Sequence, residues 1–85
     1  MKVYLKSGQV MKLNEVHSIA IDNVCYGVGK YYDVNVDDKF VSILNVFELC
    51  KDNKGSCITF YFGLCNCVDT MTDDIIAIML ADEEE

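Results

Sequence analysis

The chain contains no arginine, no proline and a single histidine, and these scarcities restrict the functions and folds that are open to it. Contacts to nucleic-acid phosphates need clustered Lys and Arg side chains. Because seven lysines stand against fourteen carboxylates, we expect no direct binding to nucleic acid. Proline is one of the residues that protect the exposed edges of β-sheets. Without it, closure into a barrel or pairing between subunits would have to cover those edges.

Long apolar runs are also missing. No run reaches the roughly 18–20 residues that a membrane-spanning helix needs, and the opening Met1-Lys2-Val3-Tyr4 lacks the apolar segment of a secretory signal. We therefore expect a cytoplasmic protein that binds no membrane. In a reducing cytosol the five cysteines are expected to be free thiols that act as small buried hydrophobes.

The length of 85 residues allows one domain with one core. We expect a β-rich domain over residues 1–81 and a frayed acidic tail over residues 82–85. The hydrophobic content of 52% is high for this size, which favours partial coverage by another copy of the chain. A homo-oligomer is therefore an alternative to a monomer.

The stretch Gly55–Val68 is the most apolar and aromatic part of the chain, and it holds three cysteines and no charged residue. It reads as a strand that is stable only inside a core. Alternation places Ile58, Phe60 and Phe62 on one face, with Cys57, Thr59 and Tyr61 on the other.

The opening predicts a β-hairpin whose loop is Ser7-Gly8, because two alternating runs flank a glycine. A two-residue loop would place Leu5 opposite Val10 and Tyr4 opposite Met11.

Two further strands are predicted around a turn at Asp22-Asn23. The first covers residues 16–21, with His17, Ile19 and Ile21 on one face. The second covers residues 24–36, where Gly27 and Gly29 indicate a bulge or a close backbone approach. Its second half alternates cleanly, with Tyr32, Val34 and Val36 on one face, and residues 37–39 form the next turn.

Residues 40–50 and 75–81 are ambiguous between helix and strand. As a helix the first segment would begin at Asp37 or Asp38, but its β-branched residues favour a strand. The second segment also favours a strand, because a helix would end in the acids 82–85, against the helix dipole. The predicted fold class is therefore all-β or β-rich α+β: a small antiparallel meander, as a barrel or a two-layer sheet, with at most one short helix at 40–50 or 73–84.

No motif predicts chemistry. Cys65-Asn66-Cys67 lacks the second thiol pair of a typical zinc site, and His17 has no recognisable catalytic partner. Gly27-Val28-Gly29 lacks the following helix of a phosphate loop. The spacing of Asp69, Asp73 and Asp74 matches no calcium-binding loop, so a solvated turn is expected. We predict no enzyme, no cofactor and no bound metal.

Charge is distributed unevenly along the chain. Residues 1–42 carry five lysines and five acids, whereas residues 43–85 carry two lysines and nine acids, which accounts for the net charge of −7. The natural complement of such a surface is a basic surface on another protein. An alternative is that the acids serve only solubility. Tyr31, which alternates outward beside Asp33, is the predicted aromatic anchor of the contact.

The opening Met1–Val10, M-K-V-Y-L-K-S-G-Q-V, resembles the hairpin openings of small phage and prophage accessory proteins. The size, the acidity and the lack of an enzyme motif resemble the anti-CRISPR and other anti-defence inhibitors among them. The resemblance implies a non-catalytic inhibitor that docks on a basic surface of a host protein in the host cytosol, such as a nucleic-acid-binding defence complex. The alternatives are an oligomeric protein that sequesters a small nucleotide signal and a phage structural or assembly subunit. The predicted binding residues are Tyr31, Asp33, Asp69, Asp73, Asp74, Asp82, Glu83, Glu84 and Glu85.

The uncharged segment Cys57–Phe62 should be the most protected part of the backbone, because it is predicted to be a strand inside the core. Hydrogen–deuterium exchange followed by mass spectrometry or NMR should place its amides among the slowest in the chain. Exchange there as fast as in the opening hairpin would contradict the prediction.

Overall fold

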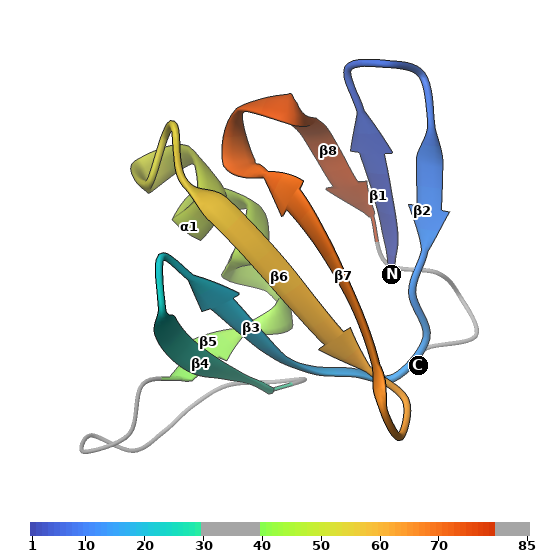
Figure 1. Cartoon of the computed structure of the whole chain (residues 1–85), viewed down its shortest axis with the longest axis vertical. Helices are drawn as coiled ribbons and strands as arrows, with labels where there is room; N and C mark the ends of the chain where they lie inside the picture. Colours follow the sequence, from blue (N-terminus) through green and yellow to red (C-terminus); the bar gives the residue numbers. More distant parts are fainter. Residues whose placement is uncertain (30–39, 80–85) are drawn as a thin grey trace.

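The computed structural model describes residues 1–29 and 40–79, which form two β-sheets and one short α-helix (Figure 1). The three-stranded sheet has the order β2 (Val10–Lys12), β1 (Lys2–Leu5), β8 (Ile75–Met79). The five-stranded sheet has the order β5 (Phe40–Ser42), β4 (Val24–Gly29), β3 (Val16–Ile21), β6 (Cys57–Phe62), β7 (Asn66–Met71). The helix is α1 (Val46–Asp52), and two 3₁₀ turns are η1 (Ile43–Asn45) and η2 (Thr72–Asp74). The predicted β-rich α+β fold class is confirmed.

β6 lies inside the five-stranded sheet, with antiparallel partners on both sides. Its side chains alternate as predicted: Ile58 and Phe60 have no exposed surface, whereas Cys57 and Tyr61 are exposed. One hydrophobic cluster unites both sheets and the helix. Its buried members are Met1, Val3, Met11, Leu13, Ile19, Ile21, Val46, Cys50, Ile58, Phe60 and Ile75.

The strand that was predicted over Gly55–Val68 is interrupted. β6 ends at Phe62, a turn follows in which Gly63 has a φ of 67°, and β7 begins at Asn66. A positive φ is readily available to glycine, so the chain reverses there and pairs with itself. Phe62 lies opposite Asn66 and Cys57 opposite Met71.

The opening hairpin forms, but its register differs by one residue from the prediction. Tyr4 lies opposite Val10, and Val3 lies opposite Met11. The loop has three residues instead of two, because the Leu5 amide donates to the Gln9 carbonyl at 3.0 Å and Gly8 takes a φ of 96°. A three-residue loop that ends in a left-handed glycine is a common hairpin connection. It brings the two buried residues, Val3 and Met11, onto the same face.

The turn between β3 and β4 is confirmed. Asp22 and Asn23 have φ values of 50° and 72°, as the two central residues of a type I′ turn require, and Ile21 lies opposite Val24. Pairing continues without a shift to Gly27, opposite Ser18, so the bulge alternative was wrong at Gly27. Gly27 also lies opposite Phe40 in the parallel pair β4–β5, an exception to the antiparallel meander.

The predicted position of His17 was wrong. Val16 lies opposite Phe62 and Ser18 opposite Tyr61, so that His17 is an extra residue in β3. This bulge re-aims the side chain. His17 is exposed and does not share the core face with Ile19.

The preferred strand prediction for residues 40–50 holds only for Phe40–Ser42 and was wrong beyond them. Residues 46–52 form α1, whose Val46 and Cys50, one helical turn apart, are 0% and 2% exposed. Burial of this face outweighs the β-propensity of the segment. Leu44, in η1 just before the helix, is 67% exposed. The Asn53 side chain donates to the Leu49 carbonyl at 2.8 Å at the end of the helix.

The strand prediction for residues 75–81 is confirmed over Ile75–Met79, which excludes the helix alternative there. β8 pairs antiparallel with β1 and contains a bulge at Ile76, since Leu5 lies opposite Ile75 and Tyr4 opposite Ala77. The predicted strand at residues 31–36 and the turn at 37–39 lie outside the described residues. Within residues 1–29 and 40–79, no helix is long and apolar enough to span a membrane.

Truncation of Phe60 should test whether β6 organises the core. Phe60→Ala removes a fully buried ring and should lower the free energy of unfolding by about 3–5 kcal/mol, much of the stability of a chain this small. Phe60→Leu should cost about 1 kcal/mol and keep the fold measurable. Tyr61→Ala on the exposed face is the control, and urea denaturation followed by circular dichroism is the measurement. Equal losses from Phe60→Ala and Tyr61→Ala would refute this assignment.

Candidate interaction surface

Three aspartates from different elements accept hydrogen bonds from residues 55–59, which lead into β6 and form its first half. The Gly55 amide donates to Asp73 Oδ1 at 2.9 Å, and the Thr59 hydroxyl donates to Asp69 Oδ1 at 2.6 Å. Asp22, in the turn between β3 and β4, accepts from the Ser56 hydroxyl at 2.6 Å and from the Cys57 amide at 3.4 Å. All three aspartates are exposed.

Hydrogen bonds hold these carboxylates in place without neutralising them. Over residues 1–29 and 40–79 the only ion pair is Lys51–Glu48, at 3.3 Å on α1. The aspartates therefore keep their charge available to a partner. Their fixed positions also reduce the side-chain entropy that would be lost on binding.

Asp74 adds a fourth carboxylate next to Asp73 in η2. It is exposed, and its backbone carbonyl accepts from the Lys6 amide at 2.8 Å, which ties η2 to the opening hairpin. We call Asp22, Asp69, Asp73 and Asp74 the acidic surface.

A sheet face with a single charged residue, Asp69, adjoins the acidic surface. In the five-stranded sheet Cys25, Ala20, Thr59 and Asp69 lie in one cross-strand row, and Gly27, Ser18, Tyr61 and Cys67 lie in the next. Cys57 and Met71 form a further pair on the same face. We call these ten residues the outer sheet face.

The outer sheet face is open to solvent and nearly free of charge. Tyr61 is 36% exposed and Met71 is 41% exposed. Asp69 is the only acidic residue among the ten. A centre with few charges and a charged rim is the usual composition of a protein–protein interface.

The cysteines do not behave as the buried hydrophobes that were predicted. Cys50 is buried, whereas Cys25, Cys57, Cys65 and Cys67 are exposed, and all five are free. The described part of the chain contains no group of three or more His, Cys, Asp or Glu residues able to hold a metal ion. Cys65 lies in the turn before β7 and Cys67 within it.

Burial raises the pKa of the Cys50 thiol to about 11. This thiol is therefore protonated at neutral pH and is a poor nucleophile. His17 Nδ1 lies 2.8 Å from the Ser18 hydroxyl oxygen, an exposed contact between neighbours in the sequence.

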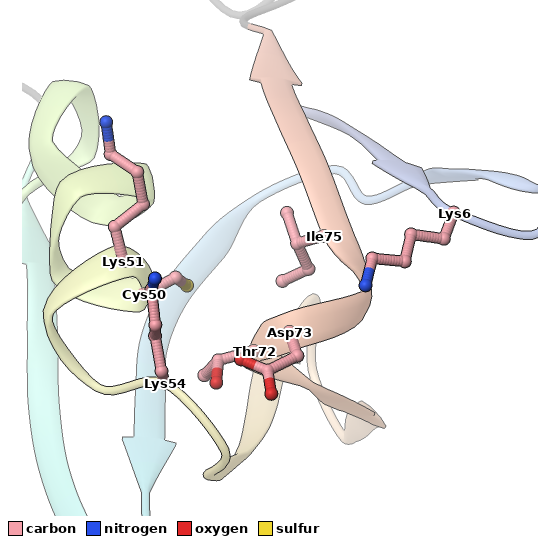
Figure 2. Close-up of a pocket in the computed structure, with 7 residues that line it drawn as sticks. All are labelled: Lys6, Cys50, Lys51, Lys54, Thr72, Asp73 and Ile75. Atoms are coloured by element: carbon pink, nitrogen blue, oxygen red, sulfur yellow. The ribbon is translucent and has the colours of Figure 1, made fainter.

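A hollow of about 350 Å³ lies between α1, η2 and the opening hairpin (Figure 2). Its lining residues are Lys6, Cys50, Lys51, Lys54, Thr72, Asp73 and Ile75. The fold brings three lysines, Lys6, Lys51 and Lys54, to this one cavity.

The polar groups of the hollow are mostly engaged within the chain. Lys51 pairs with Glu48, and its ammonium lies 5.2 Å from the centre of the Phe47 ring. The Thr72 hydroxyl donates to the Asn53 carbonyl at 2.7 Å and accepts from the Ser56 amide at 3.2 Å. The carboxylate of Asp73 faces the same cavity and would repel an anion.

Three of the residues predicted to bind a partner can be located. Asp73 and Asp74 lie in the 3₁₀ turn η2, whereas Asp69 lies within β7 and not in the expected turn. Asp69 is bonded to Thr59 in β6 and Asp73 to Gly55 just before β6, and Asp73 also lines the hollow. Tyr31, Asp33, Asp82, Glu83, Glu84 and Glu85 lie outside the described residues.

Sequence reasoning missed Asp22 as a member of the surface. Its place in the Asp22-Asn23 turn was predicted correctly, but its contact with Ser56 joins residues 34 positions apart. Only the pairing of β3 with β6 creates that proximity.

Comparisons of the chain with protein-family models, with curated proteins and with solved structures find no significant match.

The reactivity of the five thiols should divide into two classes. At mildly alkaline pH an aromatic disulfide reagent should modify the four exposed cysteines rapidly and Cys50 slowly, because burial both shields the Cys50 thiol and keeps it protonated. All five should react in guanidinium chloride. Cys50→Ala is the matched control and should remove only the slow class. Rapid reaction of all five thiols in the native protein would show that Cys50 is accessible.

Proposed function

We propose that the protein is a non-catalytic binding protein that docks on a basic surface of another protein through its acidic surface. The observation that carries this proposal is that Asp22, Asp69 and Asp73 are exposed, fixed by hydrogen bonds and not paired with a lysine in the described part of the chain. Preorganised charges of this kind favour recognition of cationic side chains, because little ordering remains to be done on binding.

The outer sheet face supplies the uncharged part of the proposed contact. Tyr61 and Met71 offer apolar area next to the carboxylates, and the small residues around them allow close approach of a partner. The acids at 82–85 follow β8 in the sequence and extend the negative charge of the C-terminal half. In this arrangement the outer sheet face excludes water, and the acidic surface selects a basic partner.

The class of partner follows from the resemblance of the chain to phage anti-defence proteins. A host defence complex that binds nucleic acid has a basic channel, and an acidic protein can occupy such a channel in place of the phosphate backbone. We propose an inhibitor of this kind, acting by occupancy and not by catalysis.

Sequestration of a small nucleotide signal is the second candidate, and the hollow favours it. Lys6 and Lys54 line the hollow without an ion-pair partner among the described residues. The candidate is weaker, because Asp73 lines the same space and Lys51 is already paired.

The docking proposal predicts a specific dependence on charge. The amide variant Asp22→Asn/Asp69→Asn/Asp73→Asn/Asp74→Asn keeps acceptor oxygens for the hydrogen bonds but removes four charges. Its association rate with the partner captured by the immobilised wild-type chain should fall by about tenfold or more at low salt. The difference should shrink as the Debye length shortens from about 10 Å at 0.1 M to about 3 Å at 1 M salt.

The matched control is Lys2→Gln/Lys6→Gln/Lys12→Gln, which should bind the partner as the wild type does or more tightly. Neutralising the four acids at 82–85 together should slow association more than it speeds release, as expected of charges at a rim. If the amide variant keeps its affinity to within about twofold, near 0.4 kcal/mol, the acids serve solubility and the proposal is wrong. Failure of the wild-type chain to retain any protein would also contradict it.

A further inference from the structure

The outer face of the three-stranded sheet carries apolar and cationic side chains, in contrast to the acidic surface. Val10, Tyr4 and Ala77 lie in one cross-strand row, and Lys12, Lys2 and Met79 lie in the next. Ile76, at the bulge of β8, is 55% exposed, as is Met79, and Val10 is 39% exposed. We call these seven residues the basic sheet face. It is apolar and cationic, and it contains no carboxylate.

The two lysines of this face have no counter-charge among the described residues. Lys2 and Lys12 lie directly opposite each other on β1 and β2, an arrangement that is unfavourable for like charges. No carboxylate in the described part of the chain forms an ion pair with either lysine. A carboxylate that approached from outside would relieve this repulsion, and the surrounding apolar side chains would add area to the contact.

The acidic surface of the same chain carries the complementary charge. Asp22 and Asp69 lie beside and within the five-stranded sheet, and Asp73 and Asp74 lie in η2, whereas the basic sheet face belongs to β1, β2 and β8. The two surfaces share no residue, although η2 leads directly into β8. We propose that copies of the chain associate head to tail, with the basic sheet face of one copy on the acidic surface of the next.

A symmetric contact of either surface with itself is disfavoured. Two basic sheet faces would place four lysines together, and two acidic surfaces would place carboxylates against carboxylates, both of which cost free energy. A heterologous contact pairs opposite charges, and it leads to a ring if it closes or to an open chain if it does not.

The contact should be weak and concentration-dependent. The molecule measures only 36 × 30 × 23 Å, and a face of three short strands offers less than the roughly 800 Å² per partner of a standard stable interface. The net charge of −7 also opposes close approach of two copies. A basic protein that docks on the acidic surface would compete with self-association, because both use the same aspartates.

Sedimentation velocity with paired variants tests this inference. Lys2→Gln/Lys12→Gln removes the charge of the basic sheet face, and Asp22→Asn/Asp69→Asn/Asp73→Asn removes charge from the acidic surface. The wild type should show a sedimentation coefficient that rises with concentration, and each variant alone should have a dissociation constant raised by about tenfold or more. An equimolar mixture should form dimers, because each variant contributes the surface that the other lacks.

Three results would overturn the inference. The wild type could remain monomeric at every concentration, either variant could associate as the wild type does, or the mixture could remain monomeric. Circular dichroism establishes that each variant is folded. If Lys2→Gln disturbs β1, the exposed substitution Ile76→Gln takes its place and carries the same expectation.

The head-to-tail contact and the docking proposal can be refuted independently of each other. A wild-type chain that binds a basic partner but never self-associates contradicts only the head-to-tail contact. A chain that self-associates but retains no basic partner contradicts only the proposed function. Lys2→Gln/Lys12→Gln should lose self-association and keep docking, which separates the two within one variant.

Discussion

The burial of one face of β6 is the constraint on which the structure depends. Ile58 and Phe60 have no exposed surface, and a sheet of five strands buries them only if other elements cover that side. The cover comes from α1 through Val46 and Cys50, and from the three-stranded sheet through Val3 and Ile75. In a chain of this size little other apolar surface is available, and its burial is what offsets the conformational entropy lost on folding. The helix and the three-stranded sheet are therefore both required to cover the buried face of β6.

Local pattern was enough to predict the elements that depend on near neighbours. The alternation of β6 and the presence of a turn at Asp22-Asn23 follow from side-chain period and turn chemistry, and both were predicted correctly. The helix at residues 46–52 was not preferred, because it depends on burial against strands distant in the sequence. The register of the first hairpin and the orientation of His17 each depend on one extra residue, in a loop and in a bulge. Alternation alone does not reveal such a residue.

In the candidate surface, too, some residues could be identified from the sequence, whereas others are brought into place only by strand pairing. The excess of acids in the second half of the chain was evident from the sequence, and Asp69, Asp73 and Asp74 could be nominated from it. Asp22 belongs to the neutral first half, so charge counting gave no reason to include it. Its carboxylate joins the others only because β3 pairs with β6 and brings the turn beside Ser56 and Cys57. The distinct basic sheet face likewise appears only when β8 is placed beside β1.

Because side chains alternate along β6, its buried residues and its outward-facing residues differ in how freely they can be substituted. Ile58 and Phe60 cannot change without affecting the core, whereas Thr59 and Tyr61 between them point to the outer sheet face. Most cross-strand neighbours of these two residues on that face are small, namely Ser18, Ala20 and Cys67. Substitutions at such positions leave the packing of the interior intact. A lineage carrying this fold can therefore change the chemistry of its outer sheet face while it keeps the packing of its core.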